Sequence, residues 1–275
     1  MEKTFLFFDI ECADGQKAIC EYGYVLTDEK FNVIRKGNIL MDPECRFRLT
    51  GRSGQADLVL TYPYSEYYKY YPFYDSYETI KNLMTQKDLL IFGHAVNNDI
   101  GFIFKDCNRY KLPLFDYTAF DIQKMLPVFN KQNKRYTSLE TAFVDLVPAE
   151  IKSELKNHRA CDDAMKTMLV FKAMVEDLEF TPKDLIESCP KSVFNALEYR
   201  EQTKIRRKEK RRRQGNSAKR KEGQVMWGEL YREHEPLLED PNSIGNFITV
   251  SGEMKEHTVE LKQLIEIIIM LVKLM

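Results

Sequence analysis

Short runs of apolar residues that end at charged residues open the chain and predict β-strands. The first run, TFLFFDIE, is apolar and aromatic, which indicates a buried strand. Residues 21–27 and 33–41 indicate two more strands, and the charged, turn-prone residues between them predict consecutive antiparallel pairing. DLLIFG, at residues 88–93, predicts another buried strand.

Helical periodicity takes over further along the chain. Apolar residues recur at helical spacing in four segments, near residues 76–86, 97–109, 138–146 and 161–177. Early strands followed by alternating strands and helices predict an α/β fold, with a mixed sheet flanked by helices. We expect this body to end near residue 180, where Thr181, Pro182 and Pro190 bracket another short helix.

The residues after this body differ from it in charge. Residues 200–221 carry 12 Lys or Arg and 2 Glu, a local charge of +10, so the rest of a chain with net charge −1 sums to −11. We interpret residues 181–225 as a helical and basic linker, either a charged helix or a disordered arm. It would serve as a solvated tether or attract phosphates.

Residues 226–275 look globular again and are interpreted as a small C-terminal segment. Its NFITVSG run is followed by a predicted helix at residues 257–275, an order that faintly resembles the opening of a BRCT-like module. The chain ends too early to complete such a fold. Whether the segment folds alone or binds a protein partner stays open.

Composition narrows the class of protein. With 44% hydrophobic and 30% charged residues in 275, the chain fits an ordinary globular protein. The first apolar run has no small-residue cleavage site and the apolar residues 264–275 are too few to span a bilayer, so we expect neither export nor a membrane partner. Six cysteines without a CxxC pair speak against a zinc ribbon or a disulfide framework, and we expect reduced thiols in a cytoplasmic protein.

Two carboxylates stand at the end of the first predicted strand. Asp9 and Glu11 are two residues apart, so both side chains point to the same face of the strand. Carboxylates this close repel each other unless a cation lies between them, and hard ions such as Mg²⁺ or Mn²⁺ take oxygen ligands. A lone D-x-E pair is more often a solvated strand end, so the pair needs support from elsewhere.

Two more segments supply that support. In GHAVNNDIGFI a strand runs into a loop, and Asp99 stands near the start of a helix, where a helix N-cap is the simpler interpretation of an isolated aspartate. In NHRACDDAMKT, His158 precedes Asp163 by five positions, and Asp162 competes with Asp163 as the functional residue. Together, the three segments put acid at the junction of an apolar element with a loop, in the order D-x-E, D and H-x4-D.

In this order and spacing the chain resembles the DEDD superfamily of 3′-to-5′ exonucleases. The similarity is to its histidine branch, the DEDDh enzymes such as RNase T and the epsilon subunit of DNA polymerase III, and it covers about residues 4–178. FFDIE, GHAVNNDIGFI and HRACDDAMKT are similar to the three motifs. FDYTAFDIQKML and SLETAFVDL stand where the family has a strand with its aspartate and a short helix. Ala95 and Asn98 depart from the second motif, where Asn usually follows the His and an aromatic residue precedes the Asp.

The resemblance implies an RNase H-like exonuclease domain at residues 1–180, with three antiparallel strands followed by parallel strands. It implies that His158 is the general base in phosphodiester hydrolysis, because the tyrosine branch would have Tyr where Arg159 stands. The H-x4-D spacing favours Asp163 over Asp162. Two divalent cations, Mg²⁺ or Mn²⁺, would be held by four carboxylates and stabilise the attacking and leaving oxygens. The four carboxylates are those of Asp9, Glu11, Asp99 and Asp163.

An aromatic segment between the predicted third strand and first helix offers a place for bases. TYPYSEYYKYYPFYDSY, residues 61–77, has eight tyrosines and one phenylalanine in 17 residues. Tyrosine rings can stack on the bases of a single strand, each for about 1–3 kcal/mol. Packing of the segment on the body explains the rings equally well.

The sequence leaves two readings of function open. We expect the substrate to be a single-stranded 3′ end. Whether it is DNA or RNA stays open, because that choice depends on contacts to the 2′-hydroxyl that the motifs do not reveal. The alternative to an enzyme is a noncatalytic nucleic-acid-binding module that retains the exonuclease fold. The complete acidic set and His158 argue against that alternative.

Overall fold

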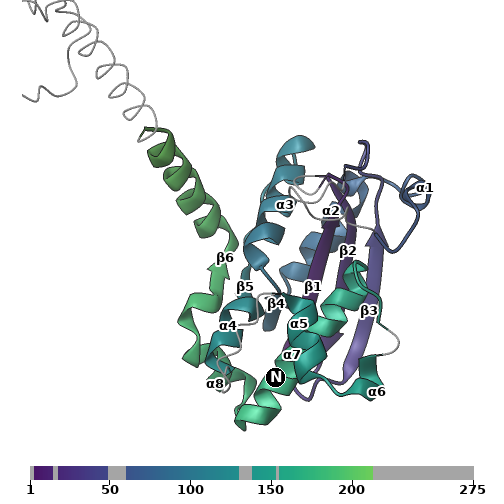
Figure 1. The fold of residues 1–275 in the computed structure, drawn as a ribbon. Helices are drawn as coiled ribbons and strands as arrows, with labels where there is room; N and C mark the ends of the chain where they lie inside the picture. The colour runs from purple at the N-terminus through teal and green to yellow at the C-terminus, as the bar shows by residue number, and fades with distance from the viewer. Residues whose placement is uncertain (1–2, 15–17, 49–59, 130–137, 153–154, 213–275) are drawn as a thin grey trace, which may run out of the picture. The chain divides into compact units, whose positions relative to one another are not determined.

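The computed structural model describes residues 3–14, 18–48, 60–129, 138–152 and 155–212. Within these residues one six-stranded sheet has the order β3-β2-β1-β4-β5-β6 (Figure 1). β1 pairs antiparallel with β2 and parallel with β4, which confirms the predicted mixed sheet. The strands are β1 (Thr4–Cys12), β2 (Ile19–Thr27), β3 (Val33–Leu40), β4 (Leu89–Gly93), β5 (Thr118–Asp121) and β6 (Val193–Asn195).

Helices cover both faces of the sheet. Three of the predicted helices, those near 97–109, 138–146 and 161–177, are confirmed within one residue at each end. The helices are α1 (Tyr64–Tyr67), α2 (Phe73–Met84), α3 (Val96–Arg109), α4 (Ile122–Phe129), α5 (Leu139–Leu146), α6 (Ala149–Lys152), α7 (Ala160–Leu178) and α8 (Pro182–Ser188). A 3-10 turn, Pro190–Ser192, precedes β6.

The sequence predicted the start of α8 correctly but placed the start of α2 too late. α2 begins at Phe73 rather than near residue 76, because Pro72 is its N-cap and the aromatic residues after it are already helical. α8 begins where Thr181 and Pro182 indicated. Thr181 accepts from the backbone N–H of Asp184, whose side chain accepts from the backbone N–H of Thr181, so the two form a capping box.

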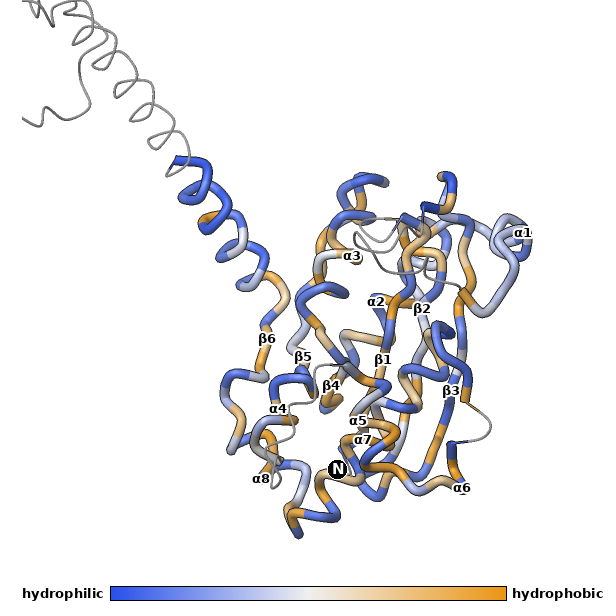
Figure 2. Tube along the Cα trace, in the orientation of Figure 1, coloured by the Kyte–Doolittle hydropathy of each residue, from blue (hydrophilic) through white to orange (hydrophobic). Residues whose placement is uncertain are grey.

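β1 divides the core into two layers. Its even-numbered residues from 6 to 10 join a buried cluster with α2 and α3, whereas Phe5 and Phe7 join another with α5 and α7. Hydrophobic residues accordingly run along the central strands (Figure 2). Because side chains alternate along a strand, Asp9 and Glu11 continue the face of Phe5 and Phe7. The end of β1 therefore directs both carboxylates toward the side that α7 covers.

The compact unit reaches beyond the expected boundary at residue 180. It comprises Met1–Gln202, because β6 pairs with β5 and adds the sixth strand to the sheet. Residues 196–212 are helical, and the side chain of Asn195 accepts from the backbone N–H of Glu198 at the start of this helix, 2.9 Å away. Of the two structures considered for the basic segment, its described part is thus a helix.

The second unit comprises Thr203–Met275. Residues 213–275 lie outside the described residues, and with them the end of the basic segment, NFITVSG and the helix expected at 257–275. All six cysteines lie among the described residues, where none forms a disulfide. Among the described residues, no helix combines the length and the apolar composition that a bilayer crossing requires.

Candidate active site

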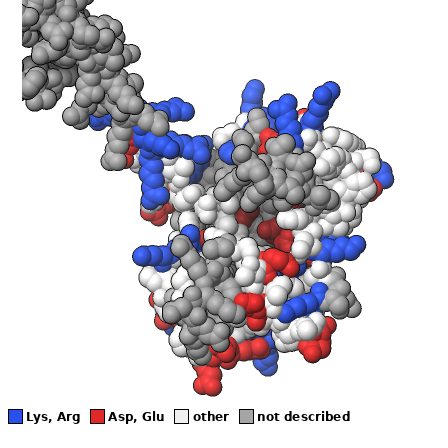
Figure 3. All heavy atoms as spheres, viewed as in Figure 1, with Lys and Arg blue, Asp and Glu red and all other residues white. Residues whose placement is uncertain are grey.

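A pocket of about 420 Å³ lies where the end of β1 meets the starts of α3, α5 and α7. Acidic side chains gather near the middle of the face seen in Figure 3, with lysines and arginines around them. The five residues singled out by the sequence motifs all line this pocket. They are Asp9, Glu11, Asp99, His158 and Asp163.

Asp9 and Glu11 bring two carboxylates to the pocket from β1. The residue that pairs with Glu11 on β2 is Glu21, so a third carboxylate lies on the neighbouring strand. Burial is the main cause that raises the pKa of Asp9 well above its ordinary value, and the charges of Glu11, Asp99 and Asp163 raise it further. The negative charges of these neighbours therefore disfavour the ionised form of Asp9.

Asp99 comes from the first turn of α3, and the local backbone explains its position. The N-cap of α3 is Ala95, in the left-handed region with φ 60°, so Asp99 is not the cap. Asp121 accepts from the backbone N–H of Ala95 at 2.9 Å and of Gln123 at 3.0 Å, which ties the end of β5 to the start of α3. Asp99 is 4% exposed, and its Oδ2 atom has no hydrogen-bond partner.

The charge on Asp99 is strongly disfavoured in this environment. Burial raises its pKa well above the ordinary value, and the charges of Asp121 and Glu11 add to the effect. A buried carboxylate oxygen without a partner is costly unless a cation or another donor meets it. Asp99 therefore fits the role of a ligand for a hard cation better than that of a structural residue.

His158 lies two residues before the start of α7, in the left-handed region with φ 57°. Its backbone N–H donates to Asp163 Oδ2 at 3.0 Å, and its Nδ1 atom is 3.8 Å from Glu11 Oε1, an ion-pair distance. The interaction with Glu11 raises the pKa of His158, whereas burial acts in the opposite direction. The imidazole is 44% exposed, so it is accessible to solvent.

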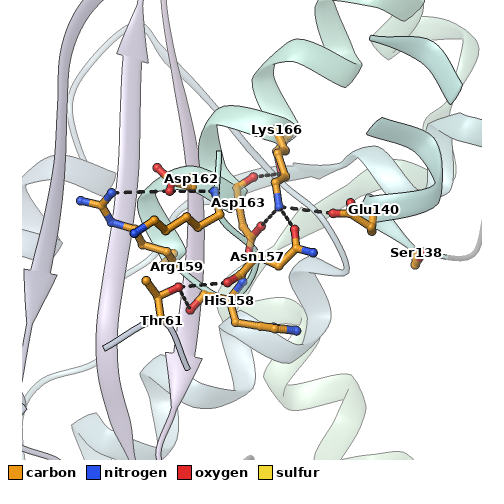
Figure 4. Close-up of polar contacts among 12 residues, drawn as sticks. Thr61, Ser138, Glu140, Asn157, His158, Arg159, Asp162, Asp163 and Lys166 are labelled. Atoms are coloured by element: carbon orange, nitrogen blue, oxygen red, sulfur yellow. Dashed lines mark hydrogen bonds and ion pairs between the residues drawn. The ribbon is translucent and has the colours of Figure 1, made fainter. Parts of the chain in front are cut away.

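The structure separates Asp163 from its neighbour Asp162. Asp162 Oδ2 accepts from the backbone N–H of Lys156 at 3.1 Å and is 3.5 Å from Arg159 Nη1 (Figure 4). It does not line the pocket, whereas Asp163 does. The preference for Asp163 that the motif spacing indicated agrees with this placement, and its role stays a prediction.

Three of the five residues are close enough to share one cation. Single ligand atoms of Glu11, His158 and Asp163 lie within 4.8 Å of one another, a grouping of potential metal ligands found nowhere else in the described part of the chain. Asp9 and Asp99 lie outside this group but line the same pocket. Carboxylate oxygens dominate the set, and Asp99 Oδ2 lacks a partner, so the residues fit hard divalent cations.

Glu21 and Gly23 of β2 set the position of the start of α7. Glu21 Oε1 accepts from the backbone N–H of Ala160 at 2.8 Å, and its Oε2 accepts from the hydroxyl of Tyr67 at 3.0 Å. Burial raises the pKa of Glu21 to about 7. Gly23 allows the helix to approach, since a Cβ atom there would lie 2.0 Å from the carbonyl carbon of Ala160. Neither residue was singled out from the sequence.

The tyrosine-rich segment is attached to the loop that carries His158. The backbone N–H of Thr61 donates to the carbonyl of His158 at 3.2 Å, and its hydroxyl donates to the carbonyl of Asn157 at 3.0 Å. Tyr67 and Tyr77 are buried, so packing explains part of the segment. Five other rings are exposed: Tyr64, Tyr68, Tyr70, Tyr71 and Tyr74.

The fold is similar to those of solved 3′-exonucleases at low sequence identity. Exonuclease I, in a structure that suggests how processivity is achieved, matches with a TM-score of 0.51 and 16% identity over 68% of this chain and 43% of that chain. The 3′-exonuclease that recognises the 3′ end of the histone mRNA stem-loop matches with a TM-score of 0.49 and 16% identity over 64% of each chain.

A third match is the nuclease domain of 3′hExo, a DEDDh family member bound to rAMP. Its TM-score is 0.49 with 16% identity, over 64% of this chain and 92% of that chain. This chain spans less than two thirds of the length of the first two relatives. No family model and no curated protein matches the chain. The match to exonuclease I confirms the expected fold, in which a mixed sheet of three antiparallel strands followed by parallel strands is flanked by helices.

Proposed function

We propose that the protein is a metal-dependent 3′-to-5′ exonuclease that removes nucleotides from the 3′ end of DNA or RNA. The observation that carries the proposal is the pocket, in which four carboxylates and one histidine from distant parts of the chain meet on an exonuclease fold. Structural roles account poorly for this set, because buried carboxylates whose pKa values are raised by burial and by neighbouring charges, as for Asp9 and Asp99, cost stability.

Two divalent cations, Mg²⁺ or Mn²⁺, would be held by Asp9, Glu11, Asp99 and Asp163. When bound, such cations supply a nucleophile at neutral pH and neutralise charge that develops on the phosphate and on the leaving oxygen. The four carboxylates lie at the end of β1 and at the starts of α3 and α7, and they would fix the positions at which the cations bind. The raised pKa values of Asp9 and Asp99 mean that cations compete with protons for these carboxylates.

His158 would act as the general base. It takes a proton from the attacking water, whose oxygen forms a bond to phosphorus while the bond between phosphorus and the 3′-oxygen breaks, and the leaving 3′-oxygen takes a proton from solvent. The products are a nucleoside 5′-monophosphate and a strand shortened by one nucleotide with a new 3′-hydroxyl. The exposure of the imidazole and its location two residues before the start of α7, which carries Asp163, suit this task.

The experiment measures cleavage of matched single-stranded DNA and RNA oligomers with Mg²⁺, with Mn²⁺ and with EDTA. Asp9→Ala and Asp163→Ala should abolish release of mononucleotides, and His158→Ala should slow it about 10²–10⁴-fold while Mn²⁺ binding is mostly retained. Asp162→Ala is the matched control. Undiminished cleavage by Asp9→Ala or Asp163→Ala protein rejects the assignment. Binding of the oligomers without any cleavage by the unmodified protein favours a noncatalytic binding module.

A further inference from the structure

A fully buried lysine lies beside the proposed cation site. Lys166 stands on α7, one turn after Asp163, and its side chain is 1% exposed. Its Nζ atom donates to Asp163 Oδ1 at 2.9 Å, to Glu140 Oε2 at 3.3 Å and to the side-chain carbonyl of Asn157 (Figure 4). A lysine ammonium has three donors and no acceptor, so these partners satisfy it completely.

The three partners of Lys166 belong to three different elements, and each lines the pocket. Glu140 comes from α5, Asn157 from the loop that carries His158, and Asp163 from α7. The Nζ atom also lies 5.7 Å from the centre of the Phe143 ring, which helps to enclose the charge. A positive charge therefore lies directly behind the residues that line an acidic pocket.

Lys166 also occupies one of the two carboxylate oxygens of Asp163. Lys166 donates to Oδ1 of Asp163, and the backbone N–H of His158 donates to Oδ2, so both carboxylate oxygens have partners. A divalent cation that binds Asp163 must share the carboxylate with this ammonium, and the two positive charges repel each other.

We propose that Lys166 is the resident counter-ion of the cation site: it neutralises Asp163 while no cation is bound, and it weakens cation binding by repulsion. The inference rests on the proposed function, since it takes Asp163 as a cation ligand. Lys166 is thereby a positioning residue, because it acts through Asp163 and Asn157. By neutralising Asp163, it stabilises the folded protein when no cation is bound. By repelling the cation, it sets the concentration at which the site fills.

The experiment uses the full chain and compares Lys166→Met with the unmodified protein. Methionine keeps an apolar, unbranched side chain but removes the charge and the donors. The matched control is Lys172→Met on the same helix, whose Nζ atom is 3.7 Å from Glu176 and whose side chain is 39% exposed. The Kd for Mn²⁺ is measured by titration calorimetry, and Tm is measured in EDTA and in saturating Mn²⁺.

Lys166→Met should bind Mn²⁺ about tenfold more tightly or better, because the repelling charge is gone. Its Tm should fall in EDTA and recover substantially in Mn²⁺, whereas Lys172→Met should match the unmodified protein in both. Lys166→Arg keeps the charge and should keep the weaker Mn²⁺ affinity, a distinction that a packing role would not produce.

Four outcomes overturn the inference. If Lys166→Met binds Mn²⁺ no more tightly than the unmodified protein, or loses the same Tm with and without Mn²⁺, Lys166 is a packing residue and the proposed function is unaffected. If Lys166→Met does not fold, Mn²⁺ binding by Lys166→Arg as weak as that of the unmodified protein supports the inference, and clearly tighter binding overturns it. If the unmodified protein binds no Mn²⁺, both the inference and the proposed cation site fail.

Discussion

Replacing Asp99 with asparagine should stabilise the protein in the absence of divalent cations, although Asp99 belongs to the proposed active site. Asp99 is 4% exposed, its Oδ2 atom lacks a hydrogen-bond partner, and burial with the charges of Asp121 and Glu11 raises its pKa. A carboxyl group whose pKa is raised by folding destabilises the folded state as pH rises above the unfolded pKa, and the full penalty is reached above the folded pKa. An amide of the same shape removes that penalty.

The size of the effect follows from the linkage between pKa and stability. Each unit by which folding raises the pKa costs about 1.4 kcal/mol. A domain of roughly 150–250 residues changes its Tm by about 2–4 °C for each kcal/mol, so each unit predicts a gain of about 3–6 °C. The gain should be largest at pH 7.5 in EDTA and should vanish toward pH 4, where aspartate is close to its unfolded pKa of about 3.9.

Thermal melting of both proteins across that pH range, in EDTA and in Mn²⁺, is the assay. With Mn²⁺ the unmodified protein should gain more Tm than Asp99→Asn, because the cation relieves the same repulsion. Asp162→Asn is the matched control: it keeps an oxygen that can accept from the backbone N–H of Lys156 but loses the ion pair with Arg159 outside the pocket, so its Tm should stay equal or fall. An Asp99→Asn protein that melts no higher than the unmodified one at pH 7.5 in EDTA would refute the reasoning.

Four further substitutions test the local geometry and the exposed tyrosine ring. Gly23→Ala should lower Tm, because the new Cβ atom meets the backbone of Ala160 at 2.0 Å, whereas Gly101→Ala in α3 meets nothing within 4 Å and should gain about 1 kcal/mol. Ala95→Gly should raise the free energy of unfolding by about 1 kcal/mol in urea titrations, since Ala95 adopts φ 60°; an unchanged midpoint would mean that no strain is stored there. Tyr71→Ser should weaken binding of single strands by about 1–3 kcal/mol without changing Tm, because its ring is 77% exposed; equal affinity would leave the ring without a role in binding.

Long periodic segments were the part of the fold that the sequence could predict. β1, α3 and α7 carry enough apolar positions to mark both their type and their bounds. α1 has four residues, and β6 has three and gains its identity only by pairing with β5, about 75 positions earlier in the chain. Pairings between such distant segments leave no periodic signal, and for that reason the body was expected to end before β6.

The residues of the candidate site also divide into those that the sequence could predict and those that it could not. The spacing of Asp9 and Glu11 within one strand was sufficient to predict that they share a face, because side chains alternate along a strand. Lys166 stands three residues after Asp163 on the same face of α7, so helical spacing could have indicated it. Glu21 could not be predicted, because its contact with the start of α7 depends on how close the helix comes to β2.

The most direct test of the proposed exonuclease activity follows a 5′-labelled single strand with Mn²⁺, beside a circular strand of the same sequence. Removal of nucleotides from the 3′ end predicts that the linear strand shortens in steps of one nucleotide, with release of nucleoside 5′-monophosphates, while the circle stays intact. Cuts within the circle, or a linear strand that is unchanged at every Mn²⁺ concentration, would contradict the account.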